Sequence, residues 1–305
     1  MDEPYAAICG ISEDEIRLQM KDDLGGLAKK LEITPEEALM KLKENYDGYH
    51  FTSPSPDIYN PFSLLNAFAD GKFGSYWFGS GTPTYLVKML DKFGVKPSEI
   101  GRRQLKSSVF DAPTETMTDA VPLLYQSGYI TIKDYNKMLD LYTLDIPNKE
   151  VRLGLMESLL PYYVNNKTPE ATTMVAYLFY DIQNGDMDAA LHRLQEFLST
   201  IPYCDNTRFE GHYQQVFYII FSLLGYYVDV EVRTPRGRVD IVLRTKTTLY
   251  VMELKLDKSA GEAMEQIDLK NYPERFALCG LPVVKVAVSF DSERCTIGDW
   301  EIINA

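Results

Sequence analysis

The sequence predicts an α+β multidomain protein in which a helical N-terminal region precedes a C-terminal α/β domain with a mixed central sheet. Residues 1–165 carry helix-start signals and one hairpin pattern, whereas residues 206–305 carry strand patterns bounded by helices. The 305-residue chain also exceeds the usual size of one hydrophobic core. We therefore expect three parts, namely 1–165, a helical connector over 166–205, and 206–305.

The N-terminal region contains two helix-start signals. Ser12 precedes an acidic turn, and Thr34 is followed by proline and two glutamates. A side-chain oxygen before the helix, proline at its first position and carboxylates in its first turn all favour initiation. Segments 46–51 and 60–65 are interpreted as turn and helix-start signals, with His50 as a packed or hydrogen-bonded residue at the core edge.

A hairpin attached to helices is expected between residues 121 and 160. A short helix to Tyr129 precedes two alternating stretches, 130–132 and 139–144, and another helix runs through Leu160. This order resembles a winged helix. Because its helix is not basic, we expect a role in packing or oligomerisation more than in DNA binding.

The C-terminal domain is expected to have the element order α-β-β-β-α-β-β. The expected elements are a helix over 209–224, strands over 227–232, 238–243 and 248–256, a helix over 259–271, and strands over 283–289 and 297–302. Such an order predicts an α/β sandwich on a mixed sheet.

Charged residues interrupt two of these strand patterns. Asp240 lies within an otherwise apolar strand, and Glu253 and Lys255 lie within the next one. Strand alternation places Glu253 and Lys255 on the same face. Because an unpaired buried carboxylate costs several kcal/mol, two of them on adjacent strands need a cation, which is a metal ion, the Lys255 ammonium, or both.

This constellation resembles the PD-(D/E)XK nuclease superfamily, whose fold is restriction-endonuclease-like. The resemblance implies that Asp240, Glu253 and the main-chain carbonyl of Leu254 bind Mg²⁺ (or Mn²⁺), and that Lys255 positions the attacking water or stabilises negative charge. Glu210 on the preceding helix and Gln266 on the following one match accessory positions, which completes the expected catalytic set.

The sequence departs from the motif that names this superfamily at one position, because Val239 stands where its proline would be. Proline supplies no chemical group, so the departure has little weight. The alternative interpretation of Glu253 and Lys255 is a surface salt bridge on an edge strand, without chemistry.

A second resemblance covers most of the remaining chain. Segments 46–51, 59–63 and 123–160 are similar to the C-terminal part of AAA-ATPase-like proteins that carry a PD-(D/E)XK domain at their end. The glycine-lysine signature of an ATP-binding P-loop is not present in this sequence, and the nearest string, 71–75, lacks the required spacing. The resemblance therefore implies a fragment of a longer parent that holds the ATPase domain.

Composition limits the function classes. The formal net charge is −13, of which residues 1–200 contribute −10 and residues 201–305 only −3. Five basic residues of the C-terminal domain surround one predicted strand pair and form a candidate phosphate-binding patch. The alternative, which has equal weight, is that they form the solvated rim of a hairpin. The patch consists of Arg233, Arg236, Arg238, Arg244 and Lys246.

Zinc sites, disulfides and membrane spans are not expected. The four cysteines and three histidines are scattered, and acidic residues follow Met1 where a signal peptide would be basic. No apolar run reaches the length of about 18 residues that a transmembrane helix needs. The sequence therefore predicts a cytoplasmic protein.

The leading hypothesis is a divalent-metal-dependent nuclease module that hydrolyses nucleic-acid phosphodiesters, with DNA as the expected form, within a larger ATPase-linked protein. The rival hypothesis is a non-catalytic module that binds nucleic acid or protein in an ATP-driven assembly. Homo-oligomerisation is left open by the sequence. Retention of Glu253 and Lys255 favours the nuclease, and the acidic net charge favours the binding module.

Overall fold

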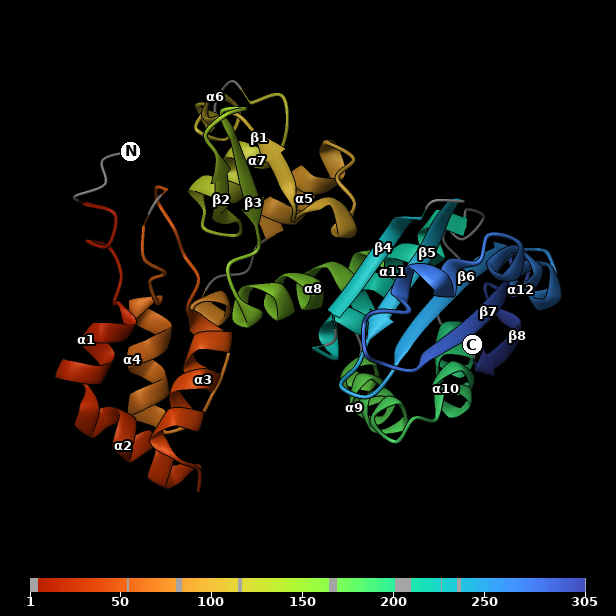
Figure 1. Ribbon diagram of the computed structural model, residues 1–305, viewed down its shortest axis with the longest axis horizontal. Coiled ribbons are helices and arrows are strands. Elements are labelled where there is room, and N and C mark those ends of the chain that lie inside the picture. The colour runs from red at the N-terminus through yellow and green to blue at the C-terminus, as the bar shows by residue number, and fades with distance from the viewer. Residues whose placement is uncertain are drawn as a thin grey trace. The chain divides into compact units, whose positions relative to one another are not determined.

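The chain forms two compact units, Met1–Ser158 and Leu159–Ala305, in a computed structural model (Figure 1). The structure describes residues 5–53, 55–80, 84–114, 117–164, 169–200, 210–225, 227–234 and 237–304. Each unit buries a hydrophobic cluster of its own, the first formed by helices and the second by a sheet and a helix.

Four helices lead the first unit. They are α1 (Glu13–Gln19), α2 (Lys21–Lys30), α3 (Pro35–Tyr46) and α4 (Pro61–Asp70). Ser12 and Thr34 both form capping boxes, which confirms the two predicted helix starts. Apolar side chains of the four helices meet in one core, in which Leu27, Leu42 and Leu64 are at most 1% exposed.

A small antiparallel sheet follows in the same unit. Its strands are β1 (Arg103–Leu105), β2 (Thr131–Asn136) and β3 (Leu141–Asp145), in the order β1-β3-β2. The β2–β3 hairpin was predicted from its alternating pattern, whereas β1 has only three residues and leaves no such pattern. The other elements are the helices α5 (Thr84–Lys92), α6 (Ser107–Phe110) and α7 (Val121–Gln126), and the 3₁₀ turns η2 (Phe78–Ser80) and η3 (Pro97–Glu99). Helix α8 (Lys149–Val164) begins in this unit and ends in the second.

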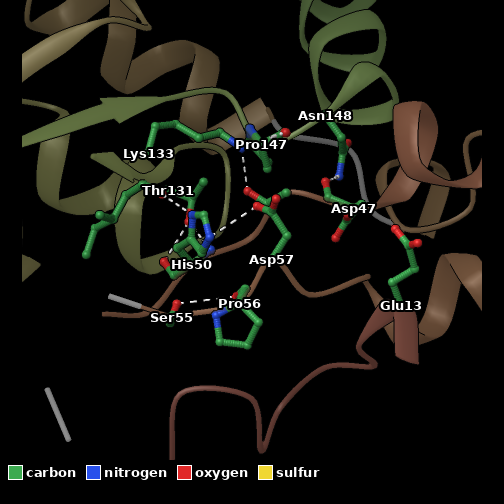
Figure 2. Close-up of polar contacts among 12 residues, drawn as sticks. Glu13, Asp47, His50, Ser55, Pro56, Asp57, Thr131, Lys133, Pro147 and Asn148 are labelled. Atoms are coloured by element: carbon green, nitrogen blue, oxygen red, sulfur yellow. Dashed lines mark hydrogen bonds and ion pairs between the residues drawn. The ribbon is translucent and has the colours of Figure 1, made fainter. Parts of the chain in front are cut away.

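The turn after α3 is fastened to the hairpin and to the start of α8 (Figure 2). The Lys133 ammonium donates hydrogen bonds to the carbonyls of Gly48 and Pro147. Gly48 has φ +94°, and a Cβ there would lie 2.5 Å from the Pro147 carbonyl oxygen, so only glycine fits. This contact explains the glycine in the sequence segment 46–51, which sequence analysis interpreted as a turn.

Polar side chains surround this turn. Asp47 is 3% exposed, and its Oδ1 has no hydrogen-bond partner among the described residues. His50 Nδ1 lies 2.9 Å from the Ile132 carbonyl oxygen, and its Nε2 lies 3.2 Å from Asp57 Oδ1 (Figure 2). His50 is therefore a hydrogen-bonded residue at the core edge, as predicted.

The second unit contains a five-stranded mixed sheet. Its elements are α9 (Pro169–Gln183), α10 (Met187–Ser199), α11 (Glu210–Leu223), β4 (Tyr227–Thr234), β5 (Gly237–Arg244), β6 (Leu249–Leu256), α12 (Ala260–Leu269), η6 (Tyr272–Phe276), β7 (Val283–Asp291) and β8 (Thr296–Asn304). The strand order is β4-β5-β6-β7-β8, and only β6 and β7 are parallel. From α11 onward, the described elements follow the predicted order.

Helices cover both faces of this sheet. Tyr213 and Phe217 of α11 contact Phe290 of β7, whereas α12 packs with Ala287 of the same strand. Because residues 287 and 290 have opposite parity, α11 and α12 lie on opposite faces. Glu253 is paired with Ala287 in register and shares the α12 face.

Within the described residues, no helix has the length and apolar character needed to cross a membrane.

Candidate active site

The candidate site lies where β5 and β6 separate. Their paired residues run from Ile241 with Met252 to Arg244 with Leu249, and the next pair in register would be Asp240 with Glu253. Instead of a ladder bond, the Leu254 N–H donates a 2.9 Å hydrogen bond to Asp240 Oδ2. The side chain of Asp240 therefore occupies the widening gap between the two strands and approaches β6.

Glu253 is the most deeply buried charged group of the site, at 1% exposure. Its Oε1 accepts hydrogen bonds from Lys255 Nζ, at 2.9 Å, and from the Gln266 amide. Its Oε2 is buried and has no partner among the described residues. Burial, together with the nearby charge of Asp240, raises the pKa of Glu253 to about 7. The carboxylate thus has one occupied and one unoccupied acceptor in an environment that disfavours its charge.

The neighbouring charges are coupled to Glu253. Burial raises the pKa of Asp240, although the hydrogen bond from Leu254 opposes this effect. Burial acts to lower the pKa of Lys255, but the hydrogen bond to Glu253 together with the negative charges of Glu253, Glu210 and Asp240 outweighs it, and the net direction is upward. Lys255 therefore remains an ammonium ion and only partly neutralises the two carboxylates.

Two further groups hold the site in place. Gln214 of α11 donates its amide N–H to the main-chain carbonyl of Asp240 at 3.0 Å. The fully buried Tyr272 donates its hydroxyl to the Arg238 carbonyl at 2.6 Å and accepts from the Gln266 amide at 3.4 Å. Neither residue belongs to the set predicted from the sequence. Gln214 follows Glu210 by one helical turn, which is a usable signal, whereas a lone tyrosine after a helix is none.

The remaining members of the predicted set lie around these carboxylates. Glu210 is the first residue of α11, and its charge acts to raise the pKa values of Asp240 and Lys255. Gln266 projects from α12 to Glu253. Leu254 lies on β6 between Glu253 and Lys255, where its N–H binds Asp240. All of the predicted residues therefore come from α11, β5, β6 and α12 of one unit.

The donor set fits a hard divalent cation better than zinc. No cluster of three or more histidine, cysteine, aspartate or glutamate side chains suited to a metal occurs in the described parts of the chain. Mg²⁺ is commonly held by one or two carboxylates and retains several waters. The unpartnered Glu253 Oε2 is a free hard ligand beside Asp240. The residues present are therefore compatible with Mg²⁺ or Mn²⁺ bound through two carboxylates, a carbonyl and water.

The predicted basic patch does not form one cluster. Arg233 and Arg238 are cross-strand neighbours at the β4–β5 turn, whereas Arg244 and Lys246 lie at the other end of β5. Arg244 lies six positions after Arg238 on this strand, a distance of roughly 20 Å. Arg236 lies outside the described residues. The prediction of a single patch was wrong because adjacency on a strand pair does not bring its two ends together.

Comparison with known proteins identifies the domain that holds the site. Residues 208–300 match the PD-(D/E)XK nuclease superfamily. Over 314 aligned residues the chain is 30% identical to a protein of Azotobacter chroococcum mcd 1 described as an uncharacterized protein in the vnfD 5′ region. That match covers 98% of this chain but 57% of the relative, so the chain spans little more than half of its length. No solved structure matches.

Proposed function

We propose that the PD-(D/E)XK nuclease superfamily domain at residues 208–300 hydrolyses phosphodiester bonds of nucleic acids with a divalent metal ion, Mg²⁺ or Mn²⁺. The observation that carries this proposal is the buried, unpartnered Oε2 of Glu253 beside Asp240 and Lys255. A purely structural ion pair would not need a second carboxylate in a site that raises the pKa of the first. Perturbed, clustered ionisable groups are typical of reaction centres.

Each residue has a distinct part in this proposal. Asp240, Glu253 and the Leu254 carbonyl would hold the metal ion, which supplies Lewis acidity at the phosphate and lowers the pKa of a bound water. Lys255 stabilises negative charge that develops on the phosphate. Gln266 fixes the orientation of the Glu253 carboxylate by donating to Oε1, which leaves Oε2 available.

Glu210 and Gln214 support the site from α11. Gln214 fixes the main chain of Asp240 through its carbonyl. Glu210 adds a third carboxylate charge near Asp240 and Lys255, which favours cation binding. We place Glu210 in an accessory role because no hydrogen bond within the described residues ties it to either group.

The rival function is a non-catalytic module that binds nucleic acid or protein. The net charge of −13 favours it, because phosphate neutralisation by lysine and arginine supplies most non-specific affinity for nucleic acids. Lys255 and Gln266 both donate hydrogen bonds to Glu253 Oε1. This arrangement is also compatible with a domain that has the fold but no catalytic activity.

The context of the domain is also a proposal. The domain would act in an ATPase-linked, cytoplasmic protein longer than this chain, with residues 1–165 as a winged-helix-like region, 166–205 as a connector and 206–305 as the nuclease-like part. The 57% coverage of the Azotobacter relative supports a longer parent. The β2–β3 hairpin followed by α8 supports the winged-helix comparison. Light scattering tests whether the protein forms a homo-oligomer.

A matched set of variants tests hydrolysis. The wild-type protein, Glu253→Ala and Lys255→Ala are incubated with labelled single- and double-stranded DNA and RNA in Mg²⁺, Mn²⁺ or EDTA. Lys285→Ala is the control, because Lys285 pairs with Asp268 at the same 2.9 Å separation on the same domain but outside the site. We expect metal-dependent cleavage by wild type and Lys285→Ala only.

Binding without cleavage would favour the rival module. If neither this chain nor the longer relative cleaves any of these substrates with either metal, while both still bind nucleic acid, the hydrolytic proposal is wrong. Direct titration with Mn²⁺ gives a second readout, because metal binding should disappear in Glu253→Ala and persist in Lys285→Ala.

A further inference from the structure

A lysine outside the predicted site lies over the strand that carries Asp240. Lys270 caps the C-terminus of α12, and its aliphatic stem crosses Gly237, the first residue of β5. A Cβ at Gly237 would lie 2.7 Å from Lys270 Cδ and 3.3 Å from its Nζ. The missing side chain at Gly237 therefore provides the space in which the Lys270 stem lies.

The Lys270 ammonium lies near Tyr272 and close enough to Glu253 for its charge to act on that carboxylate. Its Nζ lies 5.9 Å from the ring centroid of Tyr272, the residue that binds both Gln266 and the main chain of Arg238. Its positive charge also acts to lower the pKa of Glu253. Lys270 is thus a second cation beside the site, after Lys255.

Lys270 differs from Lys255 in having no carboxylate of its own. Lys255 is bound to Glu253, and Lys285 of the same domain is bound to Asp268. For Lys270, no carboxylate oxygen lies within ion-pair distance in the part of the chain that the structure describes, and its ammonium lies over the Tyr272 ring instead. Lys270 is thus partly buried and has no carboxylate partner among the described residues, so its charge is available to a ligand.

Three arginines lie near the β4–β5 turn, where Lys270 crosses Gly237. Arg233 and Arg238 face each other across β4 and β5, and Arg275 donates to the Arg233 carbonyl. Arg238 lies two positions before Asp240 on β5, and its charge acts to lower the pKa of Asp240. We call Arg233, Arg238, Lys270 and Arg275 the basic rim. Two nearby carboxylates belong to the same region, Glu231 paired with Arg238 at 3.4 Å and Glu274 bound to the Asn271 amide.

The basic rim stands out against the charge of the chain. Four cations and two carboxylates leave an excess of two positive charges next to the site, in a chain with a net charge of −13. Clefts and rims of one sign concentrate ligands of the opposite sign. The basic rim therefore favours the approach of a polyanion to this otherwise acidic protein.

We propose that Lys270 binds a backbone phosphate of the nucleic-acid strand, and that the basic rim is the side from which this strand enters the site. This inference rests on the proposed function for its choice of ligand, but it concerns binding and not hydrolysis. A lysine acts on phosphate as a point charge without base specificity, so the contact serves any sequence.

Lys270→Met and Gly237→Ala test the contact separately. Methionine keeps an apolar stem over Gly237 and Tyr272 but removes the charge. Alanine at Gly237 keeps the charge but displaces the flexible Lys270 stem, and Gly237 has no positive φ that would strain alanine. Lys246→Met is the control, because Lys246 is an exposed lysine at the opposite end of β5.

Fluorescence anisotropy with short labelled duplex DNA, single-stranded DNA and single-stranded RNA is measured in EDTA across a salt series. We expect Lys270→Met to weaken binding about fivefold, as for one charge pair at contact in water, and to reduce the salt slope by about 1. Gly237→Ala should also weaken binding but should have no further effect in Lys270→Met, since both act on one contact. Lys246→Met should bind as wild type does.

The two proposals fail differently. Equal binding by Lys270→Met and Lys246→Met, or no binding of any probe by wild type, overturns the role of Lys270 whether or not the protein cleaves. A Lys270-dependent loss of binding in a protein that never cleaves supports this inference and counts against hydrolysis. Retained unfolding midpoints in all three variants exclude misfolding as the cause, and Lys270→Arg should restore binding.

Discussion

Replacing Glu253 by glutamine should stabilise the metal-free protein while removing its response to metal. Glu253 is 1% exposed, and burial with the charge of Asp240 raises its pKa from 4.5 to about 7. Since one pKa unit corresponds to about 1.4 kcal/mol, the ionised form destabilises the folded state by about 3 kcal/mol at most. Loss of the charged hydrogen bond from Lys255 offsets part of this gain, so we expect a net stabilisation of roughly 1–2 kcal/mol.

The pH dependence has a defined sign. Because the folded pKa lies above the unfolded one, the neutral carboxyl is favoured in the folded state. Stability from this group is complete below pH 4.5 and is lost as the pH rises through about 7. The difference in free energy of unfolding between Glu253→Gln and wild type should therefore be small near pH 4.5 and largest above pH 7.

Urea unfolding in EDTA and in excess Mg²⁺ measures both effects. Wild type should gain stability with Mg²⁺ by mass action, and Glu253→Gln should not. The reasoning is refuted if Glu253→Gln is less stable than wild type in EDTA at neutral pH, because Glu253 and Lys255 would then be a net stabilising ion pair. A glutamine at Glu265, an acidic position on the exposed side of α12, is the control and should change neither quantity.

Other expected outcomes concern single groups. Lys255→Ala should lower the cleavage rate by about 10²- to 10³-fold in a gel assay, as for loss of one group that stabilises transition-state charge, and Glu210→Ala should lower it less. Burial raises the pKa of Asp47 to about 6, so Asp47→Asn should raise the free energy of unfolding by roughly 1–3 kcal/mol at neutral pH, an effect that fades as the pH falls from 6 towards 3.8. Tyr272→Phe should lower it by about 1–2 kcal/mol, because the Arg238 carbonyl loses its buried donor.

Local rules were enough to predict the helix starts at Ser12 and Thr34, the β2–β3 hairpin and the elements from α11 onward. The caps at Ser12 and Thr34 follow from side-chain oxygens that bind main-chain N–H groups three residues away, so the sequence alone contains the contact. The order of the elements along the chain after α11 follows from alternating apolar residues and turns. In contrast, β1 forms because β3 is available to pair with it, a long-range contact that leaves no local pattern.

The candidate site was only partly predictable for the same reason. Asp240, Glu253 and Lys255 attract notice because a charge within an apolar strand is unusual. The packing of the Lys270 stem over Gly237, and of Tyr272 between Gln266 and Arg238, joins residues of α12 and η6 to β5. A lysine at a helix end and a glycine at a turn have ordinary local explanations, so their meeting is visible only in three dimensions.

The separation of β5 from β6 at Asp240 leaves the spacing of the site to side-chain contacts. On the side of Ile241 that leads back to Gly237, β5 remains paired with β4 but not with β6. Among the described residues, the hydrogen bond from Leu254 joins Asp240 to β6, while Gln214, Tyr272 and Arg275 fasten β4 and β5 to α11 and η6. The distance between the Asp240 and Glu253 carboxylates therefore depends on side-chain contacts with neighbouring elements and not on a continuous ladder between β5 and β6.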